Sequence, residues 1–251
     1  MAHGHGWGSA CGFTPVGFPT LHGLETPTLT STPPYTRYTE TLSTSRPNPL
    51  PLSAAVLAGG ASSRMGRDKS LLMLDGERLI ERVVGRLAQV ADERLVSTNH
   101  PERYPFLADR VRFVPDEGGT GQGPLAGIAS LLAAATHDRV LIVATDMPCL
   151  NVALLRHMAS LPTRADVVIP LLREGGHPET THAIYHRTAL PAIQRRLAAG
   201  QRRVTSFFED VTVHTIRAAE IERFDPHHRS FVNANTPAEW EAVRANADCE
   251  G

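Results

Sequence analysis

The sequence is poor in lysine and has no surplus of either charge. Of its 25 basic residues one is a lysine, Lys69, and the other 24 are arginines. With 26 acidic residues, the formal net charge is −1. A chain this close to neutral has neither the basic surplus of a nucleic-acid-binding protein nor an acidic solvating block. We therefore expect no nucleic-acid partner.

Cysteines and long apolar runs are also scarce. The three cysteines, Cys11, Cys149 and Cys249, are an odd number, lie far apart and form no C-x-x-C pair. This argues against a disulfide framework or a structural zinc site and fits a reducing cytoplasm. No apolar run approaches the ~18 residues of a membrane span, and no signal-peptide pattern opens the chain. We expect a cytoplasmic protein with no membrane association.

Residues 1–53 differ from the rest of the chain. They are rich in Pro, Thr, Ser and Gly and have no helical or strand periodicity. Such a segment buries too little apolar surface to offset its ordering entropy, so we expect it to be disordered. An alternative is that it is an extension wrongly assigned to the protein, whose true start is then near Leu50 or Leu52. Residues 247–251 form a short tail at the other end.

Between these tails, residues 54–246 alternate between strand and helix patterns. The predicted strands are 54–58, 94–98, 110–115, 139–144, 166–172, 182–186 and 211–216; the predicted helices are 78–91, 123–135, 151–161, 188–200 and 236–246. Strands that alternate with helices predict a parallel sheet covered on both faces. The fold class is therefore α/β, a single Rossmann-like, doubly wound and mostly parallel sheet.

A glycine-rich stretch, "LAGGASSRMGRDKS" (Leu57–Ser70), follows the first strand. Glycines let backbone N–H groups approach a phosphate closely, and the edge at the carboxyl ends of parallel strands is where ligands bind. The stretch is not a Walker A loop, because Asp68 separates the glycine turn from Lys69, and it lacks the G-x-G-x-x-G spacing. Taken alone, it remains either a phosphate cradle or a plain turn.

Acidic side chains follow two other predicted strands. Asp146 comes directly after the apolar strand 139–144, and Asp116 comes after the strand 110–115. Both carboxylates are expected at the sheet edge that carries the glycine loop. A carboxylate there suits Mg²⁺, which completes its shell with phosphates and water. His177, His182 and His186 match no metal-ligand spacing, so we interpret them as surface or core side chains.

Four motifs in this order resemble the molybdenum cofactor guanylyltransferases, within the nucleotidyltransferase superfamily. They are "LAGG-x(3)-RMG-x-DK" (Leu57–Lys69), "GPLAG" (Gly123–Gly127), "DMP" (Asp146–Pro148) and "FVNANTP" (Phe231–Pro237). The first motif is shared by several transferases, whereas the ordered set is specific. The resemblance covers Ala54 to about Val243 and implies the fold of the nucleotide-diphospho-sugar transferases.

The resemblance implies a role for each matching residue. Leu57, Ala58, Gly59 and Gly60 are expected to bind the nucleotide, together with Asn99, Asp116 and Asp146. Lys69 is expected to neutralise the nucleotide phosphates and Arg64 the leaving pyrophosphate, which makes both catalytic with Asp146. Asp146 is also the expected Mg²⁺ ligand, and Asn233 and Asn235 are expected to face the acceptor. The family often has asparagine at the position of Ser97, so Asn99 is an alternative contact.

The implied reaction is Mg²⁺-dependent transfer of GMP from GTP to molybdopterin of the molybdenum cofactor, with release of pyrophosphate. GTP and molybdopterin are then the binding partners, with other proteins of molybdenum-cofactor biosynthesis as further candidates. One alternative is a sibling transferase that uses CTP or another nucleotide, although "LAGG" resembles the guanylyl rather than the cytidylyl enzymes, which tend to have "LAAG". A second alternative is a nucleotide-binding regulator, in which loss of Lys69 or Asp146 is expected; both are present.

Overall fold

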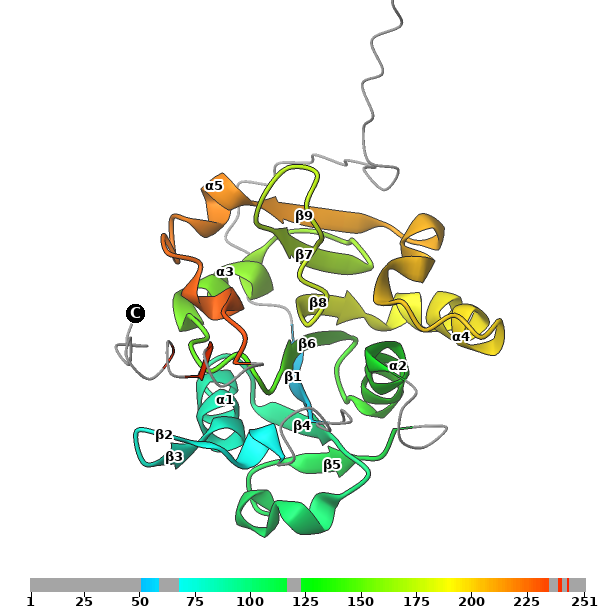
Figure 1. Ribbon diagram of the computed structural model, residues 1–251. Coiled ribbons are helices and arrows are strands. Elements are labelled where there is room, and N and C mark those ends of the chain that lie inside the picture. Colours follow the sequence, from blue (N-terminus) through cyan, green and yellow to red (C-terminus); the bar gives the residue numbers. More distant parts are fainter. Residues whose placement is uncertain (1–50, 59–67, 117–122, 235–238, 241–242, 244–251) are drawn as a thin grey trace, which may run out of the picture. The chain divides into compact units, whose positions relative to one another are not determined.

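A seven-stranded sheet, in the order β5-β4-β1-β6-β8-β7-β9, forms the centre of the fold (Figure 1). The structure is a computed structural model that describes residues 51–58, 68–116, 123–234, 239–240 and 243, all within one compact unit. The strands are β1 Leu52–Leu57, β4 Glu93–Ser97, β5 Arg112–Val114, β6 Arg139–Ala144, β7 Val167–Leu171, β8 His182–His186 and β9 Val213–Arg217. Except for those of β8, the pairings are parallel. The predicted α/β class with a mostly parallel sheet is confirmed.

Helices cover both faces of the sheet, with α1, α3 and α5 on one side and α2 and α4 on the other (Figure 1). Their bounds are α1 Leu79–Leu87, α2 Pro124–Ala134, α3 Val152–Ser160, α4 Leu190–Ala198 and α5 Ala218–Ile221. Side chains along a strand alternate between the faces: Ala54 and Val56 of β1 pack toward α1 and α3, whereas Ala55 packs toward α2. Two apolar cores, one on each face, therefore hold the sheet.

The helix ends follow local chemistry. Asn151 caps α3, as a side-chain acceptor at this position should: its Oδ1 accepts a hydrogen bond from the Leu154 N–H at 2.9 Å. α2 begins at Pro124 directly after Gly123, whose φ of +80° favours glycine. The helix predicted to reach residue 91 ends at Leu87, and Ala88 to Val90 continue as a turn. Of the predicted closing helix, Glu239, Trp240 and Val243 are described and are helical.

The orientation of β8 departs from the simple alternating pattern. This strand pairs antiparallel with both β6 and β7. A parallel return needs a crossover of a dozen or more residues, usually with a helix, and the chain between Leu171 and His182 is short and contains no helix. The strand prediction for residues 182–186 is confirmed, and the connection explains its direction.

A small hairpin was missed from sequence. Strands β2 (Met73–Leu74) and β3 (Glu77–Arg78) pair antiparallel between the first motif and α1. Asp75 and Gly76 form the turn, both with positive φ (52° and 82°), as a two-residue hairpin loop requires. The Asp-Gly pair was the signal, but strands of two residues are too short for a periodicity to appear.

His182, at the start of β8, is a core side chain. It is fully buried, and the centre of its ring lies 4.6 Å from that of Phe231. Burial lowers the pKa of His182 to about 4, although the nearby Asp225 charge and the Ser230 backbone oppose the shift. The ring is therefore neutral at pH 7.

This burial predicts a pH-dependent stability. The pKa of His182 is lower in the folded chain than its ordinary value of 6.5, so its contribution is complete above pH 6.5 and is lost as pH falls toward 4. Through this residue alone, the free energy of unfolding should drop by about 2 kcal/mol between pH 7 and pH 5. Urea denaturation of the wild type and His182→Leu at both pH values measures the difference. An equal pH dependence of the two proteins would contradict the prediction.

Candidate active site

The site is built where several parallel strands end. In the register of the sheet, Leu57 of β1 lies beside Ser97 of β4 and Ala144 of β6, and Ser97 lies beside Val114 of β5. The segments that follow these strands therefore leave the sheet at the same edge. The backbone tightens the arrangement, because the Ala58 N–H donates to the Ser97 carbonyl at 3.1 Å.

Asp116 is oriented by Ser97, the last residue of β4, and by Asn99, which follows this strand. The Ser97 hydroxyl donates to the Asp116 carboxylate, and the Asn99 Oδ1 accepts the Asp116 backbone N–H at 3.0 Å. Burial raises the pKa of Asp116, and the hydrogen bond from Ser97 opposes that shift. Asn99, predicted as a nucleotide contact, thus has its side-chain oxygen engaged in holding the loop that carries Asp116.

The α2 helix approaches this cluster through a glycine. A Cβ on Gly127 would lie 2.8 Å from Leu57 Cδ2, 3.2 Å from Ser97 Oγ and 3.3 Å from Asp116 Oδ1. The helix can reach Leu57 and Asp116 this closely only because the residue has no side chain. The motif "GPLAG" therefore brings the first turns of α2 against the ends of β1, β4 and β5.

Asp146 lies after β6, in a loop that is tied to two other segments. The Thr145 hydroxyl donates to the Leu57 carbonyl at 2.9 Å, and the Ala234 N–H donates to the Asp146 carbonyl at 3.0 Å. The second bond fixes Asn233, the residue before Ala234, next to the Asp146 loop. The described residues of the "DMP" and "FVNANTP" motifs are thus hydrogen-bonded to each other, a contact that the sequence did not predict.

The Asp146 carboxylate is partly desolvated. Burial raises its pKa, the positive charge of Lys69 lowers it, and the Glu239 charge raises it. Lys69 therefore lies near enough to Asp146 to act on its ionisation, so the structure brings these two predicted site residues together. A carboxylate that has lost water gains most from a bound cation or hydrogen-bond donor.

Lys69 begins a 3₁₀ turn, Lys69–Leu71, that is capped by Asp68. The Asp68 Oδ1 accepts hydrogen bonds from the Ser70 N–H at 3.1 Å and the Ser70 hydroxyl at 2.5 Å. The Tyr104 hydroxyl donates to its other oxygen at 3.1 Å. Asp68, noted in the sequence only as a departure from a Walker A loop, is the cap of the turn that carries Lys69.

Four predicted site residues lie outside the described residues: Gly59, Gly60, Arg64 and Asn235. Those that are described, namely Leu57, Ala58, Lys69, Asn99, Asp116, Asp146 and Asn233, all lie in the segments described above. Within the described part of the chain, no three His, Cys, Asp or Glu side chains gather as ligands for a metal ion. No helix there is long and apolar enough to cross a membrane.

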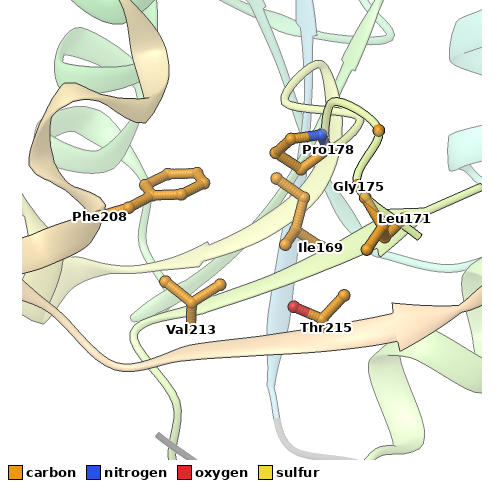
Figure 2. Close-up of a pocket in the computed structure, with 8 residues that line it drawn as sticks. Ile169, Leu171, Gly175, Pro178, Phe208, Val213 and Thr215 are labelled. Atoms are coloured by element: carbon orange, nitrogen blue, oxygen red, sulfur yellow. The ribbon is translucent and has the colours of Figure 1, made fainter. Parts of the chain in front are cut away.

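An apolar cavity of about 90 Å³ lies in another part of the sheet (Figure 2). Ile169 of β7 and Val213 of β9 line it from below, and Phe208 and Pro178 face them (Figure 2). β8 separates this part of the sheet from β6, whose end carries Asp146. None of the predicted site residues lines the cavity.

Cys149 lies in a small apolar cluster and is also disulfide-bonded. It packs with Leu74, Leu79 and Ala234, and it forms a disulfide. The sequence argued against a disulfide framework, so this bond is a departure from the expectation. Cys11 and Cys249 both lie outside the described residues.

Comparison with known proteins agrees with the geometry. Residues 54–216 match the model of the MobA-like NTP transferase domain. The chain belongs to the MobA-like NTP transferase family. It is accordingly a nucleotidyltransferase, and the resemblance of its four motifs is confirmed at the level of the family.

Individual members of the family match most of the chain. A probable molybdenum cofactor guanylyltransferase of Peptoclostridium acidaminophilum is 34% identical over 197 residues, which cover 74% of this chain and 86% of the relative. A second probable molybdenum cofactor guanylyltransferase, of Carboxydothermus hydrogenoformans, is 35% identical over 195 residues, which cover 76% of this chain and 94% of the relative. The crystal structure of molybdopterin-guanine dinucleotide biosynthesis protein A from Archaeoglobus fulgidus matches this fold with a TM-score of 0.68 at 26% sequence identity. The match covers 78% of this chain and 98% of that protein. MobA-like nucleotidyl transfer is therefore the activity class of this protein.

Four residues that shape the site were not predicted as site residues: Ser97, Thr145, Asp68 and Tyr104. Ser97 and Thr145 end or follow strands of the predicted sheet, so their position was available from the sequence. Tyr104 lies 36 residues from Asp68, and no local pattern indicates that the two meet.

Two helix-interior glycines test the close approach of α2. A Cβ on Gly85 of α1 would have open surroundings, because the nearest atom, the Arg110 Nη2, lies 3.9 Å away. A Cβ on Gly127 would lie 2.8 Å from the Leu57 Cδ2. Gly85→Ala should raise the free energy of unfolding by about 0.5–1 kcal/mol through helix propensity. Gly127→Ala should lower it by about 1–3 kcal/mol, because the methyl group overpacks the site. Chemical denaturation measures both, and equal stabilisation by the two variants would disprove the close approach.

Proposed function

We propose that this MobA-like transferase moves GMP from GTP to the phosphate of molybdopterin in the molybdenum cofactor and releases pyrophosphate. The observation that supports it most is the grouping of Asp116, Asp146 and Lys69 at one sheet edge in a chain 34–35% identical to proteins named as probable molybdenum cofactor guanylyltransferases. A phosphate oxygen of the acceptor attacks the α-phosphorus of GTP. The bond from that phosphorus to the bridging oxygen then breaks, and both electrons leave with pyrophosphate.

The chain's own residues position the reactants and balance their charge. Leu57, Ala58 and Asp116 hold the nucleotide, with Gly59 and Gly60 as further proposed contacts. Lys69 neutralises the nucleotide phosphates, and Arg64 does the same for the leaving pyrophosphate. The acceptor phosphate is already ionised at neutral pH, so the reaction needs no strong general base, and positioning with electrostatic stabilisation is sufficient.

Asp146 is the residue proposed to hold Mg²⁺. Its carboxylate is partly desolvated and offers the hard oxygen ligand that Mg²⁺ prefers, with substrate phosphates and waters to complete the shell. Bound there, Mg²⁺ supplies Lewis-acid stabilisation of the charge on the transferring and leaving phosphates. Asn233, held beside Asp146 through the Ala234 N–H, and Asn235 are proposed to face the acceptor.

Asp146→Asn tests the role of Asp146 in Mg²⁺ binding, and a carboxylate at the other end of β6, Asp138, serves as the control. Asp138 precedes β6, and its side chain is 67% exposed. Loss of the Asp146 charge should reduce the rate of pyrophosphate release by at least roughly 100-fold, whereas Asp138→Asn should leave it unchanged. The assay contains GTP, molybdopterin and Mg²⁺, with omission of Mg²⁺ as a further control. A near-normal rate for Asp146→Asn would remove this residue from the site.

The nucleotide is tested in the same assay with GTP, CTP, ATP and UTP, each with and without molybdopterin. GTP with the acceptor should give pyrophosphate, and the other nucleotides should give little. Release with CTP but not with GTP would overturn the guanylyl assignment and favour the cytidylyl alternative, while leaving the transferase class intact.

A further inference from the structure

Tyr104 is buried beneath the turn that carries Lys69. The side chain is 1% exposed and lies in the segment between β4 and β5. Its ring packs edge-on against Phe106 and stacked on Phe113, with both pairs of ring centres 6.3 Å apart. The ring therefore has a packing role of its own, which is independent of the hydroxyl group.

The Tyr104 hydroxyl is directed to Asp68. It donates to the Asp68 Oδ2 at 3.1 Å and lies 3.0 Å from the Ser70 Oγ. The Arg103 guanidinium reaches the same carboxylate oxygen at 3.4 Å. Burial, together with the Asp68 charge, raises the pKa of Tyr104 to about 12, so the hydroxyl stays protonated and remains a donor at neutral pH.

Asp68 uses both oxygens to hold the turn. Oδ1 accepts from Ser70 and Oδ2 from Tyr104 and Arg103, and the Asp68 carbonyl accepts the Leu71 N–H at 3.2 Å. A 3₁₀ turn of three residues has little stability by itself. Its direction, and with it the starting point of the Lys69 side chain, is therefore set by an anchor in a different part of the chain.

We propose that Tyr104 is a positioning residue of the transferase, whose hydroxyl acts through Asp68 to fix Lys69 against the nucleotide phosphates. This inference rests on the proposed function of Lys69. A long lysine side chain has many rotamers, and displacement of a catalytic group by about 1 Å can cost on the order of 100-fold in rate. Fixing the first residue of the turn restricts where the ammonium group can reach.

Tyr104→Phe separates the hydroxyl from the ring. The variant keeps the aromatic packing and should retain the fold, but kcat for pyrophosphate release should fall roughly ten-fold, because Lys69 stabilises charge that grows in the transition state. KM for GTP should change less than kcat. Tyr185→Phe is the matched control, since Tyr185 is fully buried and its hydroxyl donates to the Thr180 carbonyl at 2.6 Å; its kcat should stay unchanged.

A double-mutant cycle ties the effect to Lys69. In a Lys69→Arg background, Tyr104→Phe should have less than about a two-fold effect on kcat, because the group that it positions is already displaced. A ten-fold loss that persists in that background, or a Tyr104→Phe rate equal to the wild type, would overturn the positioning role while leaving the transferase intact. Absence of turnover in the wild-type protein would instead overturn the proposed function and the inference with it.

Discussion

The parallel pairing of β1 with β4 and β6 is the constraint on which the rest of the site depends. It sets Leu57 beside Ser97 and Ala144, so that the segments carrying Lys69, Asp116 and Asp146 start from one edge. A shift of register by one residue would turn every side chain of a strand to the opposite face. Because both faces are buried under helices, the core fixes the register, and the register fixes the site.

The site combines this rigid frame with groups that are costly to bury. Burial raises the pKa of both Asp116 and Asp146, which means that part of their hydration is lost on folding. A hydrogen bond from Ser97 compensates for the lost hydration of Asp116, and the positive charge of Lys69 does so for Asp146. Under the proposed function, the Mg²⁺ and phosphates of the substrate complete this compensation, so the site is suited to bind a polyanion together with a cation.

The sequence predicted the parts of the fold that repeat a simple rule. Apolar strands alternating with amphipathic helices indicated the sheet, and the strand ends located Asp116 and Asp146 at one edge. The antiparallel direction of β8 was not predicted, although the short connection without a predicted helix between residues 172 and 182 was the signal for it. The contact that anchors the Lys69 turn was not predicted, because Asp68 follows β1 and Tyr104 follows β4, and only the fold brings these two segments together.

The hydrogen-bond partners of the polar residues at the end of β4 also needed the structure. Ser97 is the last residue of β4 and Asn99 follows two residues later, yet Ser97 holds the carboxylate of Asp116 and Asn99 holds its backbone N–H. Spacing along the chain cannot separate these roles, because both depend on the path of the segment that follows β5.

Label transfer from GTP to the acceptor tests the central claim most directly. The protein is incubated with molybdopterin, Mg²⁺ and GTP that carries a labelled phosphorus at either the α or the γ position, and the products are separated. The account predicts that the α label appears in a molybdopterin–nucleotide product and that the γ label appears only in pyrophosphate. Transfer of the γ label to the acceptor, or no transfer of the α label, would contradict nucleotidyl transfer at this site.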